Sequence, residues 1–296
     1  MVSQNLVVIG TGLIGSSLAK AAKQAGAFET VWAINRSEKT CEQAETLGVA
    51  DRALTYEQLP EVATMLQDGD IVVVAVPVSV YQSIFEQLKP LLPEAVVLTD
   101  VGSSKVSVVE AVKAVWGEVP STFVPGHPIA GSEKTGVAAV NPDLFRSRRC
   151  ILTPLPETGL KATSLVTELW ESVGADVDVM DMEHHDQVLA ATSHLPHVLA
   201  YALVDALYTL DQKSEVFRYA AGGFRDFTRI AESDPTMWRD IFLSNRDAIL
   251  GQLDNFESHL SELRSAIESS DSDSIARILE RSQSARKLFS ETQTKH

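Results

Sequence analysis

Cysteine is scarce in this chain, which has only two, Cys41 and Cys150, among 296 residues. Two thiols so far apart cannot form the disulfide framework of a small secreted protein, and they fit a reducing compartment. Long apolar runs are also missing, because the longest one, at residues 71–78, is too short to cross a bilayer. No basic segment precedes the first apolar stretch, so a secretory leader is not expected. We therefore expect a cytoplasmic protein.

The chain also has few positively charged residues. Twenty-five Lys and Arg stand against forty Asp and Glu, which gives a formal net charge of −15. The overall field repels nucleic acids and anionic membranes, so neither is an expected partner. If the ligand is a small anion, its positive contacts must be local. The remaining composition, with 45% hydrophobic residues, is that of an ordinary globular protein long enough for two domains.

The two halves of the chain differ in their hydrophobic period. The first half alternates short β-branched runs with helical stretches, which predicts an α/β fold with a parallel sheet covered on both faces. The second half is helical in pattern throughout, and the chain between them has no long linker. We predict a doubly wound, modified Rossmann domain at residues 1–180 and an all-α domain at residues 181–296. The expected strands are residues 6–10, 30–34, 70–77, 95–100, 121–126 and 150–154.

A heptad seam runs through the helical half, formed by Ile249, Leu253, Phe256, Leu260, Leu263 and Ile267. Spacings of four and three residues place these side chains on one face of a helix. The face is suited to closing a bundle, either within the chain or between two chains.

A glycine-rich loop follows the first predicted strand. The segment GTGLIG at residues 10–15 has the spacing G-x-G-x-x-G and opens a predicted helix. In that context the glycines allow a tight turn and the close approach of a pyrophosphate, which then meets the N-terminus of the helix. We predict a dinucleotide site that includes Gly10, Thr11, Gly12, Leu13, Ile14 and Gly15, with Val76 and Pro77 at the end of the third predicted strand.

The end of the second predicted strand lacks the Asp or Glu that usually binds the ribose hydroxyls of NAD. Asn35, Arg36 and Ser37 stand there instead. A guanidinium and a hydroxyl suit the 2′-phosphate of NADP, and no carboxylate repels it. We predict NADP as the preferred cofactor. The alternative is NAD, with Arg36 in solvent and Asn35 tolerated.

Polar residues follow two further strands. Ser103 comes after the strand at 95–100, and His127 comes after the strand at 121–126. The carboxyl ends of parallel strands share one sheet edge, where α/β folds bind ligands, so we expect both side chains to face the nicotinamide. The alternative for a histidine before a proline is a structural role.

The helical half contains a second polar group of residues. Pro196 interrupts an apolar helical pattern, which predicts a kink, with His194 and His197 on one face beside it. Zinc is not expected, because no further ligands accompany the two histidines. Farther on, Arg225, Asp226, Arg229 and Trp238 lie in a short stretch after two glycines, and the two arginines predict a carboxylate clamp. The alternative is that these arginines form surface ion pairs with Asp226 and Glu232.

Taken together, these motifs resemble those of the prephenate dehydrogenase family. The resemblance runs from residue 6 to about residue 250 and is carried, in order, by GTGLIG, DVGSSK, GHPIAGSEKTG, SHLPH and GFRDFTRIAESDPTMWRDIF. It implies oxidative decarboxylation of prephenate to 4-hydroxyphenylpyruvate in tyrosine biosynthesis, by an oxidoreductase whose helical domain forms a homodimer. It also implies a catalytic His127 oriented by Ser103, with Arg229 on a substrate carboxylate. The other pocket residues carried over are Ser132, Glu133, His194, His197 and Asp226.

Other functions remain open at this point. Arogenate dehydrogenases are similar, but they often lack the equivalents of Glu133 and His197, so these two residues favour prephenate. Use of both substrates is also compatible with the motifs. A β-hydroxyacid dehydrogenase or imine reductase would not explain SHLPH together with GFRDFTR. A sensor that binds NADP without turnover would not need His127, Ser103 and Arg229.

Overall fold

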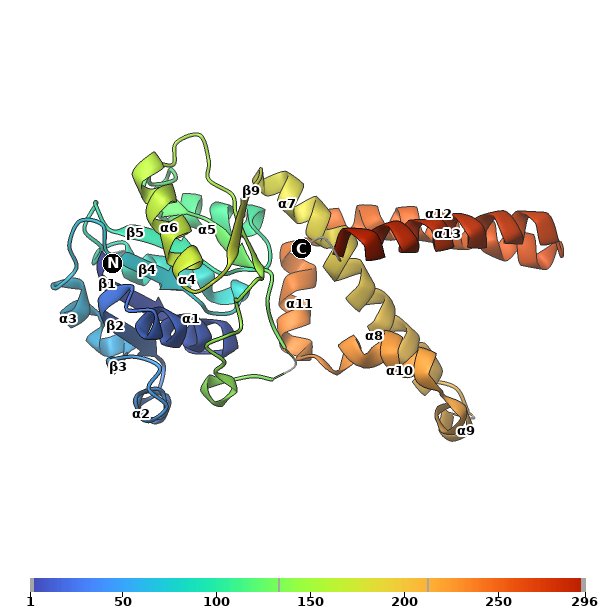
Figure 1. Cartoon of the computed structure of the whole chain (residues 1–296), viewed down its shortest axis with the longest axis horizontal. Helices are drawn as coiled ribbons and strands as arrows, with labels where there is room; N and C mark the ends of the chain where they lie inside the picture. The colour runs from blue at the N-terminus through green and yellow to red at the C-terminus, as the bar shows by residue number, and fades with distance from the viewer. Residues whose placement is uncertain (1–2, 133, 212, 294–296) are drawn as a thin grey trace. The chain divides into compact units, whose positions relative to one another are not determined.

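The computed structural model describes residues 3–132, 134–211 and 213–293. The chain divides into two compact units, at residues 1–246 and 247–296. The first unit contains both sheets and the helices up to α11, and the second contains most of α12 and all of α13 (Figure 1). The predicted boundary at residue 180 lies within the first unit, at the turn between β9 and α7.

A parallel sheet of six strands forms the centre of the first unit, in the order β3-β2-β1-β4-β5-β6. This confirms the α/β class and the parallel sheet expected from the alternating pattern. The sequence analysis missed β3, a short edge strand with only two fully apolar positions. The strands are β1 (Ser3–Ile9), β2 (Phe28–Asn35), β3 (Arg52–Thr55), β4 (Ile71–Val74), β5 (Val97–Asp100) and β6 (Phe123–Val124).

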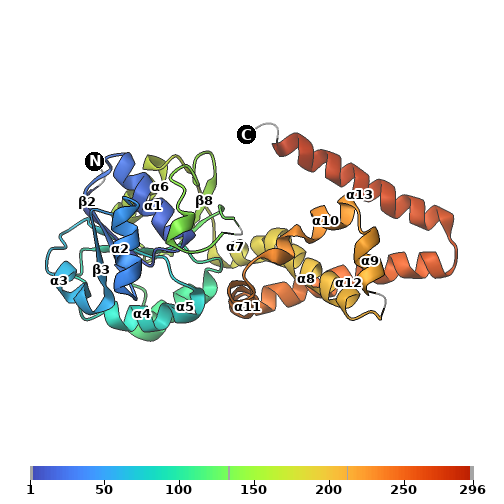
Figure 2. The same cartoon turned by 90° about the horizontal axis from the view of Figure 1, so that it is seen from below.

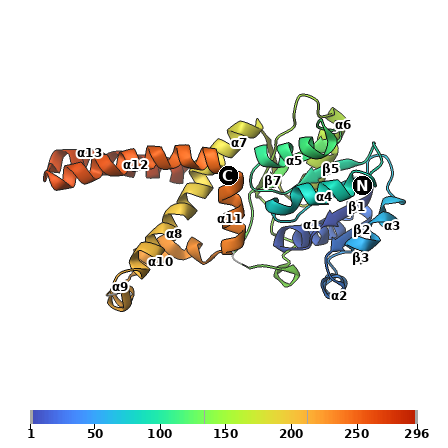
Figure 3. The ribbon, with the colours of Figure 1, turned by 180° about the vertical axis from the view of Figure 1, so that it is seen from behind.

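Alternating side chains of the strands build two separate cores. In β1, Leu6 and Val8 pack into one core, whereas Val7 and Ile9 pack into the other. Both sets are fully buried, which explains why the strands read as continuous apolar runs. Helices α1, α2 and α6 cover the first face, and α3, α4 and α5 cover the second (Figures 2 and 3). These helices are α1 (Leu13–Gln24), α2 (Glu38–Thr46), α3 (Leu59–Ala63), α4 (Tyr81–Leu88), α5 (Val106–Trp116) and α6 (Leu160–Ser172).

The apolar run at residues 121–126 does not form one strand, as the sequence predicted. It splits at Pro125 into β6, in the main sheet, and β7 (Gly126–Pro128), in a second sheet. Proline has no N–H to donate, so it interrupts a ladder of hydrogen bonds. β7 pairs antiparallel with β8 (Arg149–Leu152), which in turn pairs parallel with β9 (Asp176–Val179). The predicted strand at 150–154 therefore belongs to this second sheet, and β9 was missed.

A long helical segment follows the second sheet. Helix α7 (Met182–Leu189) begins at Asp181, whose carboxylate accepts hydrogen bonds from two backbone N–H groups of the first turn. It leads through a π-helical turn (Ala190–His194) into α8 (Leu195–Tyr208), with Pro196 in the first turn of α8. The disturbance predicted at Pro196 thus takes the form of a π turn just before the proline.

Three further helices complete the first unit. They are α9 (Lys213–Tyr219), α10 (Gly222–Thr228) and α11 (Pro235–Ser244). Asp234 caps α11, because its carboxylate accepts hydrogen bonds from the N–H groups of Thr236 and Met237.

The second unit is a pair of long helices, α12 (Arg246–Glu268) and α13 (Ser272–Gln293), which diverge from their connecting turn (Figure 2). An ion pair with an N···O distance of 3.6 Å joins Arg281 to Glu262. The predicted heptad seam lies on α12, where Leu260 and Ile267 remain more than half exposed. Within this chain the seam is therefore only partly covered. None of the helices in the described part of the chain has the length and apolar character needed to cross a membrane.

Candidate active site at the carboxyl edge of the sheet

The glycine-rich loop joins β1 to α1 as the sequence predicted. Gly10 has φ +92°, and a Cβ there would lie 2.5 Å from the carbonyl oxygen of Ala75 and 2.9 Å from Val76. A Cβ on Gly15 would lie 2.0 Å from the carbonyl oxygen of Gly10. These two glycines are required by the packing of the loop itself. Around Gly12, in contrast, no atom of the described residues other than Gly12 and its two chain neighbours lies within 4 Å of an added Cβ.

The three residues at the end of β2 have different surroundings. Asn35 is buried, and its Oδ1 accepts hydrogen bonds from the Thr11 hydroxyl (2.6 Å) and the Thr11 N–H (3.2 Å). Asn35 thus braces the glycine-rich loop. Ser37 caps α2 by accepting a hydrogen bond from the Thr40 N–H (3.3 Å). Arg36 is exposed, and close enough to Tyr56 to offset in part the rise in the pKa of the Tyr56 hydroxyl that burial causes.

His127 lies on β7, where its backbone pairs with Ile151 of β8. The preceding residue, Gly126, donates its N–H to Asp100 Oδ1 at the end of β5 (3.1 Å), so His127 follows directly from the carboxyl edge of the main sheet. The residue is 9% exposed, and its Nδ1 lies 2.9 Å from Nε2 of His185. Burial, His185 and the Lys105 ammonium hold the pKa of His127 well below its usual value. His127 is therefore neutral at physiological pH.

His185 and Asp186 extend this contact. His185 Nδ1 lies 2.8 Å from Asp186 Oδ1, and both side chains are buried. Asp186 also accepts hydrogen bonds from the N–H groups of Lys105 (2.7 Å) and Val106 (3.0 Å) at the start of α5. We call His127, His185 and Asp186 the imidazole chain. The sequence analysis missed His185 and Asp186. In the structure the buried face of α7 includes His185, whereas the neighbouring His184 is exposed. The position of each residue after the Asp181 cap could have indicated which histidine faces inward.

A buried ion pair supports the base of this site. Asp100 and Lys105 are fully buried, and Lys105 Nζ contacts Asp100 Oδ2 and the carbonyl oxygen of Gly126 (2.7 Å). Asp100 also accepts a hydrogen bond from the Gly102 N–H (2.7 Å). These contacts hold the turn that carries Ser103 next to the strand that carries His127. Ser103 itself is half-buried in that turn.

His194 and His197 do lie on one face, because both rings contact Trp238 of α11. The His197 ring stacks on Trp238 with centroids 3.5 Å apart, and the His194 ring meets it edge to face at 6.1 Å. Asn245 donates its side-chain N–H to the Asp186 carbonyl oxygen (2.8 Å) and lies 3.1 Å from His194 Nδ1. Burial lowers the pKa of His194 to about 4, although Asp186 opposes the shift.

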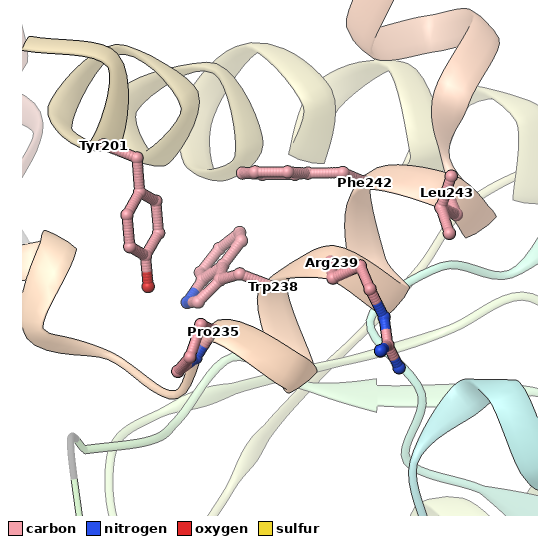
Figure 4. A pocket seen from close by; sticks show the side chains of 6 residues that line it. All are labelled: Tyr201, Pro235, Trp238, Arg239, Phe242 and Leu243. Carbon is pink, nitrogen blue, oxygen red and sulfur yellow. The ribbon is translucent and has the colours of Figure 1, made fainter. Parts of the chain in front are cut away.

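Beside the His197–Trp238 stack lies an apolar cavity of about 360 Å³. Helices α8 and α11 supply its walls (Figure 4). The Tyr201 hydroxyl donates a hydrogen bond to the carbonyl oxygen of Ser233 (2.7 Å). This bond fixes the Tyr201 ring, which forms one wall of the cavity. The lining residues are Tyr201, Pro235, Trp238, Arg239, Phe242 and Leu243.

The two arginines of the expected carboxylate clamp have different partners in the structure. Arg225 and Asp226 form a loose surface pair, 3.8 Å apart, with both side chains at least 80% exposed. Arg229 is exposed and forms no ion pair with a carboxylate among the described residues. Burial lowers the pKa of His197, and the nearby Arg229 guanidinium lowers it further. Ser132 is exposed in the loop after β7. Glu133 lies outside the described residues.

No group of three or more His, Cys, Asp or Glu side chains in the described ranges is arranged to hold a metal ion. His197 Nδ1 lies 2.9 Å from the carbonyl oxygen of Ser193, so it donates a hydrogen bond rather than offering a lone pair. Cys41 and Cys150 are both buried and unpaired.

Sequence comparison then decides the family. Residues 18–179 match the family profile described as "Prephenate dehydrogenase, nucleotide-binding domain", and residues 181–281 match "Prephenate dehydrogenase, dimerization domain". The chain belongs to the prephenate dehydrogenase family. It is accordingly a dehydrogenase of tyrosine biosynthesis with a Rossmann-like nucleotide-binding domain.

Relatives of known name agree with this. The chain is 38% identical to a cyclohexadienyl dehydrogenase of Zymomonas mobilis, over 96% of each chain. Among solved structures, it superposes with a TM-score of 0.89 on the prephenate dehydrogenase of Aquifex aeolicus in complex with hydroxyphenyl propionate and NAD+, at 34% identity over 97% of this chain and 98% of that one. The arogenate dehydrogenase of Synechocystis gives a TM-score of 0.81 at 26% identity, over 97% of this chain and all of that one.

The glycine-rich loop fits the nicotinamide dinucleotide that a prephenate dehydrogenase needs. The open space around Gly12 admits a pyrophosphate close to the backbone, next to the first N–H groups of α1. No acidic residue lies in the first turn of α1 to repel the phosphates. The backbone of Gly12, Leu13 and Ile14 would hold the pyrophosphate there.

Proposed function

We propose that this member of the prephenate dehydrogenase family catalyses the oxidative decarboxylation of prephenate to 4-hydroxyphenylpyruvate. A bound nicotinamide supplies the acceptor for the hydrogen and two electrons that leave the ring carbon carrying the hydroxyl group. The carbon–carboxylate bond breaks to release CO2, and its electron pair makes the ring aromatic. The observation that carries the proposal is the neutral, buried His127 at the carboxyl edge of the sheet.

His127 is proposed to act on the substrate hydroxyl. As positive character develops on the carbinol carbon, the hydroxyl proton becomes acidic, and a neutral imidazole can accept it. Nδ1 of His127 contacts His185, so Nε2 is the nitrogen available to the substrate. The proton returns from Nε2 to the phenol oxygen of the product, and the reaction releases no net proton. Ser103, in the neighbouring turn, is proposed to donate a hydrogen bond that orients the hydroxyl.

The substrate carboxylate is proposed to bind Arg229. Its guanidinium has no carboxylate partner among the described residues, in contrast to Arg225, and it lies near His197. In a chain with a net charge of −15, such a group supplies the local positive charge that a dianionic substrate needs. Ser132, Glu133, His194, His197 and Asp226 remain proposed pocket residues.

The proposal is tested by following the absorbance of reduced nicotinamide with prephenate and with arogenate as substrates. Turnover of prephenate with a higher kcat/KM than arogenate is expected. The second candidate is arogenate or dual use, which the names of the Zymomonas and Synechocystis relatives support. Comparable kcat/KM values for the two substrates would favour that candidate, and no turnover of either would reject both.

We further propose that NADP is preferred over NAD. Asn35 is occupied with Thr11 and offers no carboxylate to the ribose of NAD, whereas Arg36 is exposed beside the loop for a 2′-phosphate. One charge-assisted contact of roughly 1.5–3 kcal/mol corresponds to a preference of about tenfold to a hundredfold.

The Arg36→Ala variant tests this preference. It should raise KM for NADP by about tenfold or more and leave KM for NAD nearly unchanged. Lys113→Ala is the matched control, because it removes one positive charge from an exposed site on α5. Equal kcat/KM values for the two cofactors in the wild type would contradict the proposal. Equal increases in KM for NADP and NAD in the Arg36→Ala variant would also contradict it.

We also propose that the helical domain forms a homodimer. Its profile is that of a dimerization domain, and its exposed apolar side chains include Leu243 (68%) and Ile267 (59%). Surfaces of this kind in obligate dimers resemble a protein core. Light scattering at micromolar concentration should give twice the mass of the chain, and a monomer with full activity would contradict the proposal.

A further inference from the structure

The imidazole chain decides which nitrogen of His127 carries a proton. The Asp186 carboxylate accepts one backbone hydrogen bond on each oxygen, from the N–H of Lys105 on Oδ1 and from the N–H of Val106 on Oδ2, and Oδ1 also faces the His185 ring. A backbone N–H can only donate, so both carboxylate oxygens act as acceptors. His185 must therefore carry its proton on Nδ1, the nitrogen that faces Asp186.

His185 is itself buried, and burial lowers the pKa of its ring although Asp186 opposes the shift. A neutral imidazole has one N–H, so a proton on Nδ1 leaves Nε2 with a free lone pair. That lone pair faces Nδ1 of His127 at 2.9 Å. Two lone pairs cannot share this contact, so His127 donates from Nδ1. The Nε2 of a neutral His127 is then the unprotonated nitrogen.

We propose that His185 is a positioning residue of the reaction: it holds His127 in the Nδ1–H tautomer and so leaves Nε2 as the proton acceptor for the substrate hydroxyl. This inference rests on the proposed function, which assigns the proton transfer to His127. Asp186 sets the direction of the two hydrogen bonds. It also joins the start of α5 to α7, so that His127 on β7 and His185 on α7 keep their mutual position.

The arrangement has a consequence for the transition state. When His127 Nε2 accepts the proton, the ring becomes cationic, and the lone pair of His185 stabilises its Nδ1–H. The Asp186 carboxylate lies one imidazole ring away and stabilises the charge through His185. Asp186 needs no proton of its own in this scheme. The role of such a third group is to fix tautomer and orientation, as in other nucleophile and base arrangements.

Nitrogen NMR on the wild-type protein tests the tautomer without any activity. The chain has seven histidines, so labelling with ¹⁵N-histidine gives a small set of ring signals, and those of His127 are identified by their loss in His127→Asn. The expected result is a protonated Nδ1 and an unprotonated Nε2 at neutral pH. A protonated Nε2 with a bare Nδ1 would overturn the proposal, because His185 would then be donating to His127.

Kinetics of three variants test the role in the reaction. His185→Phe cannot accept a hydrogen bond and should lower kcat for prephenate by at least about tenfold, a part of the 10²–10⁴ that a general base supplies, with KM changed much less. His185→Gln places an acceptor oxygen near the former Nε2 and should recover most of kcat. His184→Phe, at the exposed neighbour on α7, should leave kcat unchanged.

The outcomes are distinguishable. A folded His185→Phe with wild-type kcat overturns the positioning role. If this variant does not fold, the positioning role is tested by the recovery of kcat in His185→Gln and by the His127 tautomer of the wild-type protein. Absence of turnover in the wild type would reject the proposed function, while the NMR result would still test the tautomer.

Discussion

At the scale of single residues, burial separates His127 from the other candidates. From sequence alone, a histidine before a proline is compatible with either a structural or a catalytic role. The structure places His127 on a short strand, where it is neutral and contacts a second histidine. The exposed members of the predicted site, Arg229 and Ser132, are placed by helix ends and loops instead. The proposed base and the proposed substrate-binding residues thus differ in their burial.

His127→Asn should lower kcat for prephenate by roughly 10²–10⁴, because the base acts in the transition state. Asn retains a group that can reach His185, so the fold should persist. The dissociation constant for NADP, measured by titration calorimetry, should stay within about threefold of wild type, because His127 is not part of the glycine-rich loop. His184→Asn is the control at an exposed histidine. More than about a tenth of wild-type kcat would remove His127 from the mechanism.

Arg229→Ala should raise KM for prephenate by about tenfold to a hundredfold and lower kcat less, since a carboxylate contact acts in ground and transition states alike. Arg225→Ala is the matched control, because Arg225 lies one turn earlier and is paired with Asp226 on the surface. Steady-state kinetics compare the two. An unchanged KM in Arg229→Ala would show that another group holds the carboxylate.

At the scale of elements, the strands differ in how well their sequence predicts them. Strands β1, β2, β4 and β5 are buried on both faces, so each is a strong apolar signal. Strands β3 and β9 are edge strands of only four residues, and each has just two apolar positions, so their sequences RALT and DVDV give weak strand signals. The division of residues 121–128 between two sheets follows from Pro125, but only the packing shows that β7 joins β8.

The glycine-rich loop allows a paired test. Gly12→Ala places a methyl in open space, so the thermal unfolding temperature should barely change while KM for NADP rises by about tenfold, because the methyl occupies the space proposed for the pyrophosphate. Gly15→Ala places a Cβ 2.0 Å from the Gly10 carbonyl oxygen and should lower the free energy of unfolding by about 1–3 kcal/mol. Wild-type KM in Gly12→Ala would show that the pyrophosphate lies elsewhere.

At the scale of the whole molecule, buried histidines make stability depend on pH. The pKa values of His127, His185, His194 and His197 are all lowered by burial. Between the ordinary histidine pKa of about 6.5 and the lowered value, the unfolded chain binds more protons than the folded one. The free energy of unfolding is therefore at its full value above about pH 6.5 and falls as the pH decreases towards the folded pKa values.

His194 provides the quantitative case, because burial lowers its pKa to about 4. Between about pH 7 and pH 4.5, the protonation of His194 should lower the free energy of unfolding by on the order of 2–3 kcal/mol. His194→Asn keeps an acceptor near Nδ1 for Asn245 and cannot titrate, so urea unfolding at fixed protein concentration should show a smaller loss over this range. In His184→Asn, the control at an exposed histidine, the free energy of unfolding should fall with pH by as much as in the wild type. Equal losses in both variants would show that His194 is accessible to protons in the folded state.

What the sequence determined by itself is the part encoded in neighbouring residues. The spacing in GTGLIG, the alternation of strands and helices, and the proline at 196 predict the nucleotide loop, the fold class and the disturbed helix, because steric and hydrogen-bonding limits act within a few residues. The order of the motifs was enough to indicate the family.

What only the tertiary structure decided is which polar groups meet. His127 and His185 lie 58 residues apart in sequence, and their contact depends on β7 leaving the main sheet and on Asp186 holding the start of α5. Asn35, next to Arg36 in sequence, turned inward to Thr11 because its β-strand phase buries it. No local pattern encodes such contacts, since they arise from the packing of elements whose side chains alternate between core and site.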